Sequence, residues 1–156
     1  MTPPESAFGN PDQALIHRFR HHADGPLAID SNPMARALGA ELWRLDPQGG
    51  TVELAFLPEA LFIQGTGVLQ GGAVTAMLDF AMAFALMAQL PPGDSCATVN
   101  LSTAFLRPAP PGRYRASGTV ERRGRSLAFT HARLQRDDNG LVVATATSTL
   151  AVQPGP

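Results

Sequence analysis

Asp79 is the residue whose type and setting most favour chemistry. It is the only charged residue between Glu59 and Asp94, and it lies in an otherwise apolar stretch with helical periodicity. An ionised carboxylate in apolar surroundings is unfavourable, so a buried acid is paired, protonated or functional. Asp79 is therefore a candidate catalytic base or nucleophile. A buried carboxylate satisfied by its neighbours, or paired with a distant Arg, is the alternative.

Two glycines precede this carboxylate, at the point where the helical pattern begins. Gly71 and Gly72 would place backbone N–H groups without intrahelical acceptors at the positive end of the helix dipole. Such groups suit a developing oxyanion, and Gln64 and Gln70 can add amide donors. A Gly-Gly pair alone is also typical of a tight turn, so the oxyanion hypothesis depends on its combination with Asp79.

The spacing of these groups limits how they can act together. Gly71 and Asp79 are eight residues apart, which is about 12 Å along a helix axis at 1.5 Å per residue. One carbonyl group cannot touch both. If they act on the same substrate, the glycine turn of one chain must meet the carboxylate of another. An antiparallel helix pair across a two-fold axis achieves this and predicts a homodimer with two equivalent sites.

The elements that position these groups can be inferred from hydrophobic periodicity and turn residues. Asn-Pro pairs predict the start of a helix over residues 10–24 and of a short helix over 32–39, which ends at Gly39. Residues 40–58 read as a hairpin around a Pro-Gln-Gly-Gly turn. A long apolar helix follows over about 72–90. The remainder predicts four antiparallel strands, over residues 95–108, 112–124, 126–137 and 140–152.

The long helix has almost no polar face, so it must be covered on nearly all sides. The antiparallel sheet is the available cover, which predicts an α+β domain with one central helix inside a curved sheet of about six strands. We expect an N-terminal helical segment over 1–38 and the main domain over 39–152. A membrane-spanning helix is disfavoured, because an Asp at the bilayer centre costs about 2.5–3.5 kcal/mol and no basic residue flanks the helix.

Composition limits the functional classes. The chain has 156 residues, which suits one domain, and its formal net charge of −1 gives no reason to expect nucleic acid or a membrane as partner. Residues 99–156 hold eight Arg against three acids, a local charge of +5 that could meet a small polyanion. The single Cys96 cannot form an internal disulfide, and the N-terminus shows no signal-peptide pattern. We therefore expect a cytoplasmic protein.

These motifs carry a family resemblance. The pattern Gln64-x-x-Gly67-x-x-Gln70-Gly71-Gly72, with Asp79 nine positions after Gln70, is followed by TVNLSTAFLRPA at 98–109 and VERRGRS at 120–126. Together they resemble the hotdog-fold acyl-CoA thioesterases of the phenylacetate-degradation (PaaI-like) type, and the match runs from about Gly39 to Val152. The family's fold has a long central helix wrapped by a curved antiparallel sheet.

The resemblance implies a role for each matching residue. Asp79 would act as general base or nucleophile on a thioester, the Gly71 N–H would bind the oxyanion, Gln64 would contact the thioester and Thr98 would orient the attacking water. The family's sites are shared across a dimer, usually within a tetramer, and need no metal or redox cofactor. Gln70 stands where the family has a His, and a carboxamide cannot carry a proton.

Binding residues are less sharply indicated. We expect Gly72 to contact the substrate. Arg107 and the arginines of the 121–125 turn are candidates for binding coenzyme A phosphates, with a solvated hairpin end as the alternative for that turn; the arginines are Arg122, Arg123 and Arg125. We also expect four apolar helix residues to surround an aromatic or short/medium acyl group; these are Met77, Met82, Phe84 and Met87. The paired His17 and His21 suit a solvated face better than a metal site.

Two other functions stay open. A non-catalytic acyl-CoA-binding module would keep the groove and arginines but would not need Asp79. A hydratase or dehydratase of the same fold would need a His beside the acid, and no His lies in this motif region.

Overall fold

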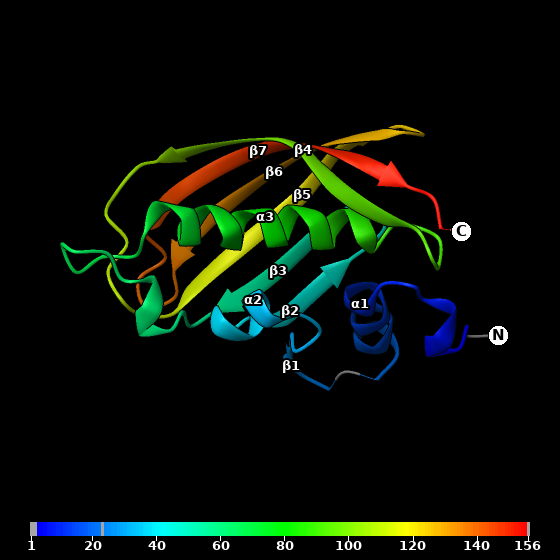
Figure 1. The fold of residues 1–156 in the computed structure, drawn as a ribbon, viewed down its shortest axis with the longest axis horizontal. Helices are drawn as coiled ribbons and strands as arrows, with labels where there is room; N and C mark the ends of the chain where they lie inside the picture. Colours follow the sequence, from blue (N-terminus) through cyan, green and yellow to red (C-terminus); the bar gives the residue numbers. More distant parts are fainter. Residues whose placement is uncertain (1–2, 23, 156) are drawn as a thin grey trace.

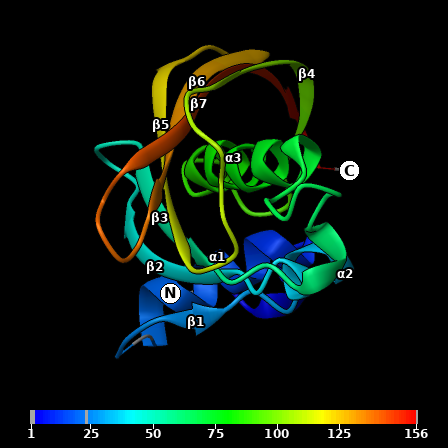
Figure 2. The same ribbon diagram turned by 90° about the vertical axis from the view of Figure 1, so that its left-hand side faces the viewer.

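The computed structural model describes residues 3–22 and 24–155. Its central helix, α3 (Gly71–Met87), lies along the concave face of a seven-stranded antiparallel sheet (Figure 1). Viewed along α3, the sheet curves around the helix, and the smaller helices α1 (Pro11–His22) and α2 (Pro33–Ala37) lie below it (Figure 2). The predicted α+β fold with one wrapped helix is confirmed.

The strands run in the spatial order β1-β2-β3-β5-β6-β7-β4. A two-residue strand, β1, brings the sheet to seven strands where about six were expected. The 3₁₀ turns η1 (Glu5–Ala7) and η2 (Ala60–Phe62) complete the elements. The strands are β1 (Leu27–Ala28), β2 (Glu41–Asp46), β3 (Thr51–Phe56), β4 (Ser95–Phe105), β5 (Tyr114–Arg123), β6 (Leu127–Arg136) and β7 (Val142–Gln153).

The strand that follows the central helix does not pair with its neighbour in sequence. β4 pairs with β7, whereas β5 pairs with β3, so β4 forms one edge of the sheet. Its outer side has no strand partner among the residues that the structure describes. This placement runs β4 beside α3 and brings its inward side chains to the helix.

Close packing fixes α3 against the middle of the sheet. A β-carbon built on Gly118 of β5 would lie 2.2 Å from the Ala81 carbonyl oxygen, so only glycine allows this approach. Met77, Met82 and Phe84 are fully buried in this interface. The expectation that they surround an acyl group is therefore wrong, because they face the sheet and pack in the core.

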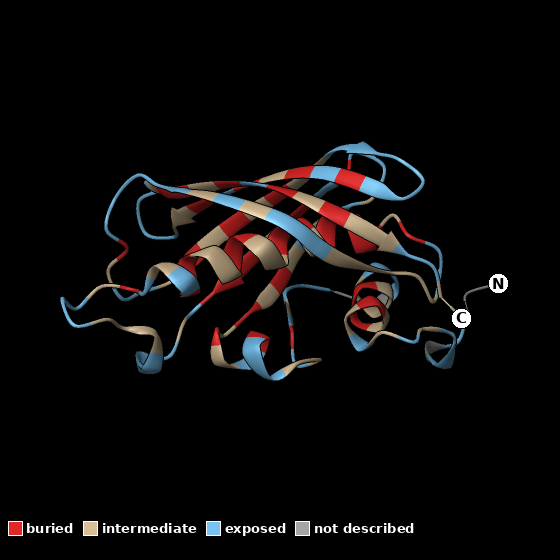
Figure 3. Ribbon diagram, turned by 45° about the horizontal axis from the view of Figure 1, so that its top comes forward, coloured by how far each residue is buried: buried red, intermediate tan, exposed pale blue. Residues whose placement is uncertain are grey.

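One side of α3 is left without a cover. A row of residues along it is exposed or only half-buried, whereas the rest of the helix after Gly71 is buried (Figure 3). We call this row the open strip; it comprises Gly72, Thr75, Ala76, Asp79, Phe80 and Ala83. Its residues share one face of the helix, as their spacing of three or four requires. The sheet of one chain is thus insufficient cover for this helix.

The predicted helix starts are confirmed. The Asn10 side-chain oxygen accepts a hydrogen bond from the Asp12 N–H at 2.9 Å, and that of Asn32 accepts one from the Ala35 N–H at 2.8 Å. Buried Gln13 links α1 to the segment that follows α3, because its amide nitrogen donates a hydrogen bond to the Pro91 carbonyl at 2.8 Å. In the described part of the chain, no helix is long and apolar enough to cross a membrane.

Candidate active site

Asp79 lies in the middle of the open strip, beside the inward face of β4. The Thr98 hydroxyl donates a hydrogen bond to Asp79 Oδ1 at 2.9 Å. Burial raises the pKa of Asp79 above its ordinary value, and the hydrogen bond from Thr98 acts in the opposite direction. A carboxylate with a raised pKa is a stronger base than an exposed aspartate.

An irregularity in β4 aims Thr98 at this carboxylate. The register with β7 shifts between Thr98 and Asn100, so Val99 is an extra residue and is 62% exposed. The buried Ser148 hydroxyl donates to the Asn100 carbonyl at 2.8 Å and holds the distorted backbone. A bulge of this kind redirects the side chains beside it. Here it allows Thr98 to face α3 while the strand continues.

The backbone groups that could bind an oxyanion lie at the start of α3. The Gln70 carbonyl accepts hydrogen bonds from the Ala73 and Val74 N–H groups, which closes the first turn. Among the described residues, no acceptor bonds the N–H of Gly71 or Gly72. These two N–H groups remain available for an anion at the positive end of the helix dipole.

A groove of about 530 Å³ opens at this turn. It is walled by the loop before α3 and by the end of β4 with the segment after it; its lining is Gln64, Thr66, Val68, Leu69, Gly71, Val74 and residues 105–109. The Gln64 Oε1 accepts hydrogen bonds from the Thr66 N–H at 2.7 Å and hydroxyl at 2.9 Å. This fixes the amide orientation and leaves its NH₂ group to donate to a ligand.

The structure places the remaining predicted site residues in different environments. Gln70 contributes backbone bonds, but its side chain is exposed and does not line the groove. Gly72 is exposed, and a β-carbon built on it meets no described atom within 4 Å. Arg107 lines the outer part of the groove, where its guanidinium donates to the Val142 carbonyl at 2.7 Å.

The expected phosphate-binding arginines do not form one cluster within a chain. The β5–β6 turn lies at the C-terminal end of α3, where the Arg123 guanidinium donates to the Gln89 carbonyl at 2.6 Å. Arg107 lines the groove beside Gly71, at the N-terminal end of the helix. The helix between them is about 25 Å long, at 1.5 Å per residue. Within one protomer, Arg107 and the arginines of this turn are therefore too far apart to bind the same phosphate group.

Cys96 and the histidines stand apart from this chemistry. Cys96 is half-buried, and burial together with the negative charges of Asp79 and Asp12 raises its pKa to about 11. The rings of His17 and His21 are in contact, with centroids 4.5 Å apart and planes tilted by 48°. Within residues 3–22 and 24–155, no three His, Cys, Asp or Glu side chains gather closely enough to hold a metal ion.

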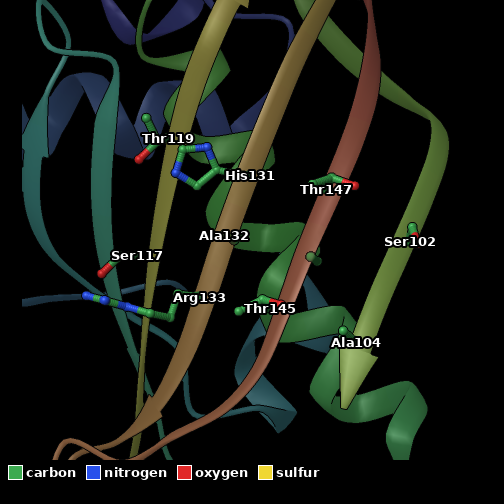
Figure 4. Close-up of a pocket in the computed structure, with 10 residues that line it drawn as sticks. Ser102, Ala104, Ser117, Thr119, His131, Ala132, Arg133, Thr145 and Thr147 are labelled. Carbon is green, nitrogen blue, oxygen red and sulfur yellow. The ribbon is translucent and has the colours of Figure 1, made fainter. Parts of the chain in front are cut away.

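A second hollow, of about 560 Å³, lies on the opposite face of the sheet (Figure 4). Its lining is mostly hydroxyl-bearing and small; it includes Ser102, Ala104, Ser117, Thr119, Thr145 and Thr147, with His131 and Arg133 among them. The His131 Nδ1 lies 2.8 Å from Glu121 Oε1. No hydroxyl bonds this imidazole among the described residues.

Sequence reasoning missed two features of the site. Phe105, at the end of β4, is 57% exposed and projects into the groove beside Gly71. The Thr75 hydroxyl donates to the Thr103 hydroxyl at 3.2 Å, one helical turn before Asp79. An aromatic residue directly before Leu-Arg-Pro was a visible signal for Phe105. The Thr75–Thr103 pair depends on the edge position of β4, which no local pattern indicates.

Comparison with known proteins agrees with this architecture. The Thioesterase superfamily matches residues 66–143, which include Gly71, Asp79 and Thr98. A phenylacetic acid degradation-related protein of Ralstonia eutropha JMP134 is 34% identical, with a TM-score of 0.76 over 91% of this chain and 99% of that one. A thioesterase family protein of Silicibacter pomeroyi is 31% identical, with a TM-score of 0.73 over 80% and 91%.

A curated relative is more distant. The medium/long-chain acyl-CoA thioesterase YigI of Salmonella typhimurium LT2 is 26% identical over 143 residues, which cover 82% of this chain and 90% of that one. The resemblance to the phenylacetate-degradation type is thus confirmed. The chain belongs to the thioesterase superfamily and is a thioester hydrolase of the hotdog fold.

Proposed function

We propose that this enzyme hydrolyses the thioester of an aromatic or short/medium-chain acyl-CoA to the free acid and coenzyme A. The observation that carries the proposal is the Thr98–Asp79 pair on an otherwise uncovered, apolar helix face. A half-buried carboxylate with one hydroxyl partner is an unfavourable feature that a binding module does not need. The curated relative is named for medium- and long-chain acyl-CoA, which supports the CoA thioester class.

Asp79 and Thr98 act on the water molecule in the proposed reaction. Thr98 positions the water, Asp79 takes its proton, and the oxygen bonds to the thioester carbon. The carbonyl oxygen becomes an oxyanion held by the Gly71 N–H and the Gln64 amide. The C–S bond then breaks, and the coenzyme A thiolate takes up a proton. Direct attack by Asp79, giving an anhydride that water hydrolyses, uses the same geometry. Neither route requires a metal or redox cofactor.

The site is proposed to be shared between two copies of the chain. Gly71 and Asp79 are too far apart along α3 to act on one carbonyl, whereas antiparallel α3 helices bring one copy's turn to the other's carboxylate. The uncovered open strip and the unpaired edge of β4 support this dimer. The same two-fold axis carries the arginines of one copy's β5–β6 turn towards Arg107 of the other, where phosphates of one coenzyme A could bind both.

A dimer of dimers is the further proposal for assembly. The outer face of the sheet carries short hydroxyl and alanine side chains across β5, β6, β7 and β4 (Figure 4). Short side chains let a second sheet approach closely, and their hydroxyls can bond across the contact. The mass of the particle in solution, measured by light scattering, distinguishes a tetramer from a dimer.

Complementation between two inactive variants tests the shared site. Asp79→Asn removes the base, and Gly71→Val obstructs the oxyanion turn; each alone is expected to be inactive. When they are mixed and allowed to exchange subunits, half of the dimers are hybrids with one intact site, which restores about a quarter of wild-type thiol release. Activity that stays at the level of the separate variants contradicts a site built from two chains.

A further inference from the structure

Resting on the proposed thioesterase function, we propose that Phe105 is a specificity-determining residue that excludes acyl groups branched at the carbon next to the thioester. The structure gives this residue an unusual position. It is the last residue of β4, and its side chain is 57% exposed inside the groove that starts at Gly71.

The ring of Phe105 fills the space that a side chain at position 71 would occupy. A β-carbon built on Gly71 would lie 3.3 Å from Phe105 Cζ and 3.4 Å from Cε1. Gly71 has no positive φ, so its backbone conformation does not demand glycine. The neighbouring ring is therefore the reason that a larger residue at 71 is unfavourable.

The same contact places the ring beside the reacting carbonyl. A bound oxyanion lies about 3 Å from the Gly71 nitrogen. That nitrogen and the β-carbon position are both bonded to Gly71 Cα and are about 2.5 Å apart. Substituents of the thioester carbon that turn towards β4 consequently come within van der Waals distance of the ring. The methylene group next to the carbonyl of an unbranched acyl chain passes the ring edge. An additional methyl on that methylene carbon competes with the Phe105 ring for the same space.

Phe105 has little to contribute to folding. Its ring is mostly exposed, while the neighbouring inward residues of β7 are buried beneath the sheet. Phe129 on β6 is a matched control: it is also an exposed phenylalanine, 45% accessible, but it lies outside both the groove and the hollow of the outer face. Its replacement should affect the fold similarly and leave selectivity unchanged.

The test compares isomeric or homologous acyl groups in one enzyme preparation. We would measure kcat/KM for butyryl-CoA against 2-methylpropanoyl-CoA, and for phenylacetyl-CoA against 2-phenylpropanoyl-CoA. Overpacking by one methyl predicts that the wild type favours the unbranched member by about tenfold or more. Phe105→Ala should bring that ratio close to one, whereas Phe129→Ala should keep the wild-type ratio. Gly71→Ala, which retains the N–H, should raise the ratio because it narrows the same space.

The outcomes separate the two levels of the proposal. If the unbranched substrates are turned over but Phe105→Ala leaves the ratio of kcat/KM values unchanged, the role of Phe105 is overturned. The thioesterase proposal then still stands. A wild type that releases no thiol from any of the four substrates overturns both. Because each ratio is taken within one preparation, a smaller fraction of folded variant cannot mimic the expected change.

Discussion

Replacing Asp79 with Asn removes the proposed base while preserving its shape and its contact with Thr98. The Asn side-chain oxygen can accept the 2.9 Å hydrogen bond that Thr98 donates to Asp79. The groove and the Gly71 turn are untouched, since they lie at the start of α3, about two turns before residue 79. Loss of a general base lowers turnover by about a hundred- to ten-thousand-fold. Thiol release from acyl-CoA, followed at saturating substrate, should fall within this range.

The same substitution should stabilise the fold at neutral pH. Burial raises the folded-state pKa of Asp79, so the folded chain binds this proton more tightly than the unfolded chain does. Below the ordinary aspartate pKa of about 3.9, both states are protonated and the carboxyl has no effect. As the pH rises from the ordinary aspartate pKa through the raised folded-state pKa of Asp79, the free energy of unfolding falls. This loss of stability persists at pH 7. Asn does not titrate and escapes this loss.

Melting curves of wild type and Asp79→Asn at several pH values measure this effect. The two melting temperatures should coincide near pH 3 and diverge towards pH 7, with Asn the more stable. An Asn variant that is less stable at pH 7, or that keeps its turnover, would refute the assignment of Asp79 as a destabilised, functional carboxylate. A stable variant without turnover supports it, because stability and activity then change in opposite directions.

Four further predictions concern single residues. Thr98→Val removes a hydrogen bond that lowers the Asp79 pKa, so the acid limb of the kcat/KM pH profile should move to higher pH, whereas Thr98→Ser should keep it in place. Gln70→His should change kcat less than about threefold, because this side chain lies outside the groove. A larger change in kcat would contradict the view that Gln70 contributes only through its backbone. Arg107→Ala should raise KM with kcat nearly constant and weaken the dependence of KM on ionic strength; an unchanged KM would remove Arg107 from substrate binding. Cys96, with its pKa of about 11, should be only about 0.1% thiolate at pH 8, so the native protein should resist a thiol reagent that labels it rapidly after denaturation.

Much of the fold follows from local signals. Asn10 and Asn32 cap the helices that their Asn-Pro pairs predict, and Gly39 ends the second of these with a φ of +59°. The length and apolarity of α3 predicted that a curved sheet must wrap it. These inferences succeed because capping, turn conformation and burial are set by residues close together in sequence.

The arrangement of the site depends on contacts between distant residues. The bond from Ser148 to the Asn100 backbone, which supports the bulge beside Thr98, joins residues 48 positions apart. The pairing of β4 with β7 has the same non-local character, and it decides which arginines lie near Gly71. The sequence suggested Arg107 and Arg123 as joint phosphate ligands, whereas within one chain the topology puts them at opposite ends of α3. Strand pairing over such distances leaves no trace in local periodicity.

The contact between Gly118 and Ala81 has a consequence for how this enzyme could acquire new substrates. With no β-carbon on Gly118, α3 touches the strand backbone directly, and the helix cannot slide or roll without collision. The carboxylate at position 79 is therefore held at constant height above the sheet, whatever acyl group is bound. Substrate range can change only where the walls are adjustable: along β4, in the 64–70 loop and at the surface presented by a second chain. Directed evolution should accordingly accumulate changes there and leave the helix–strand contact intact.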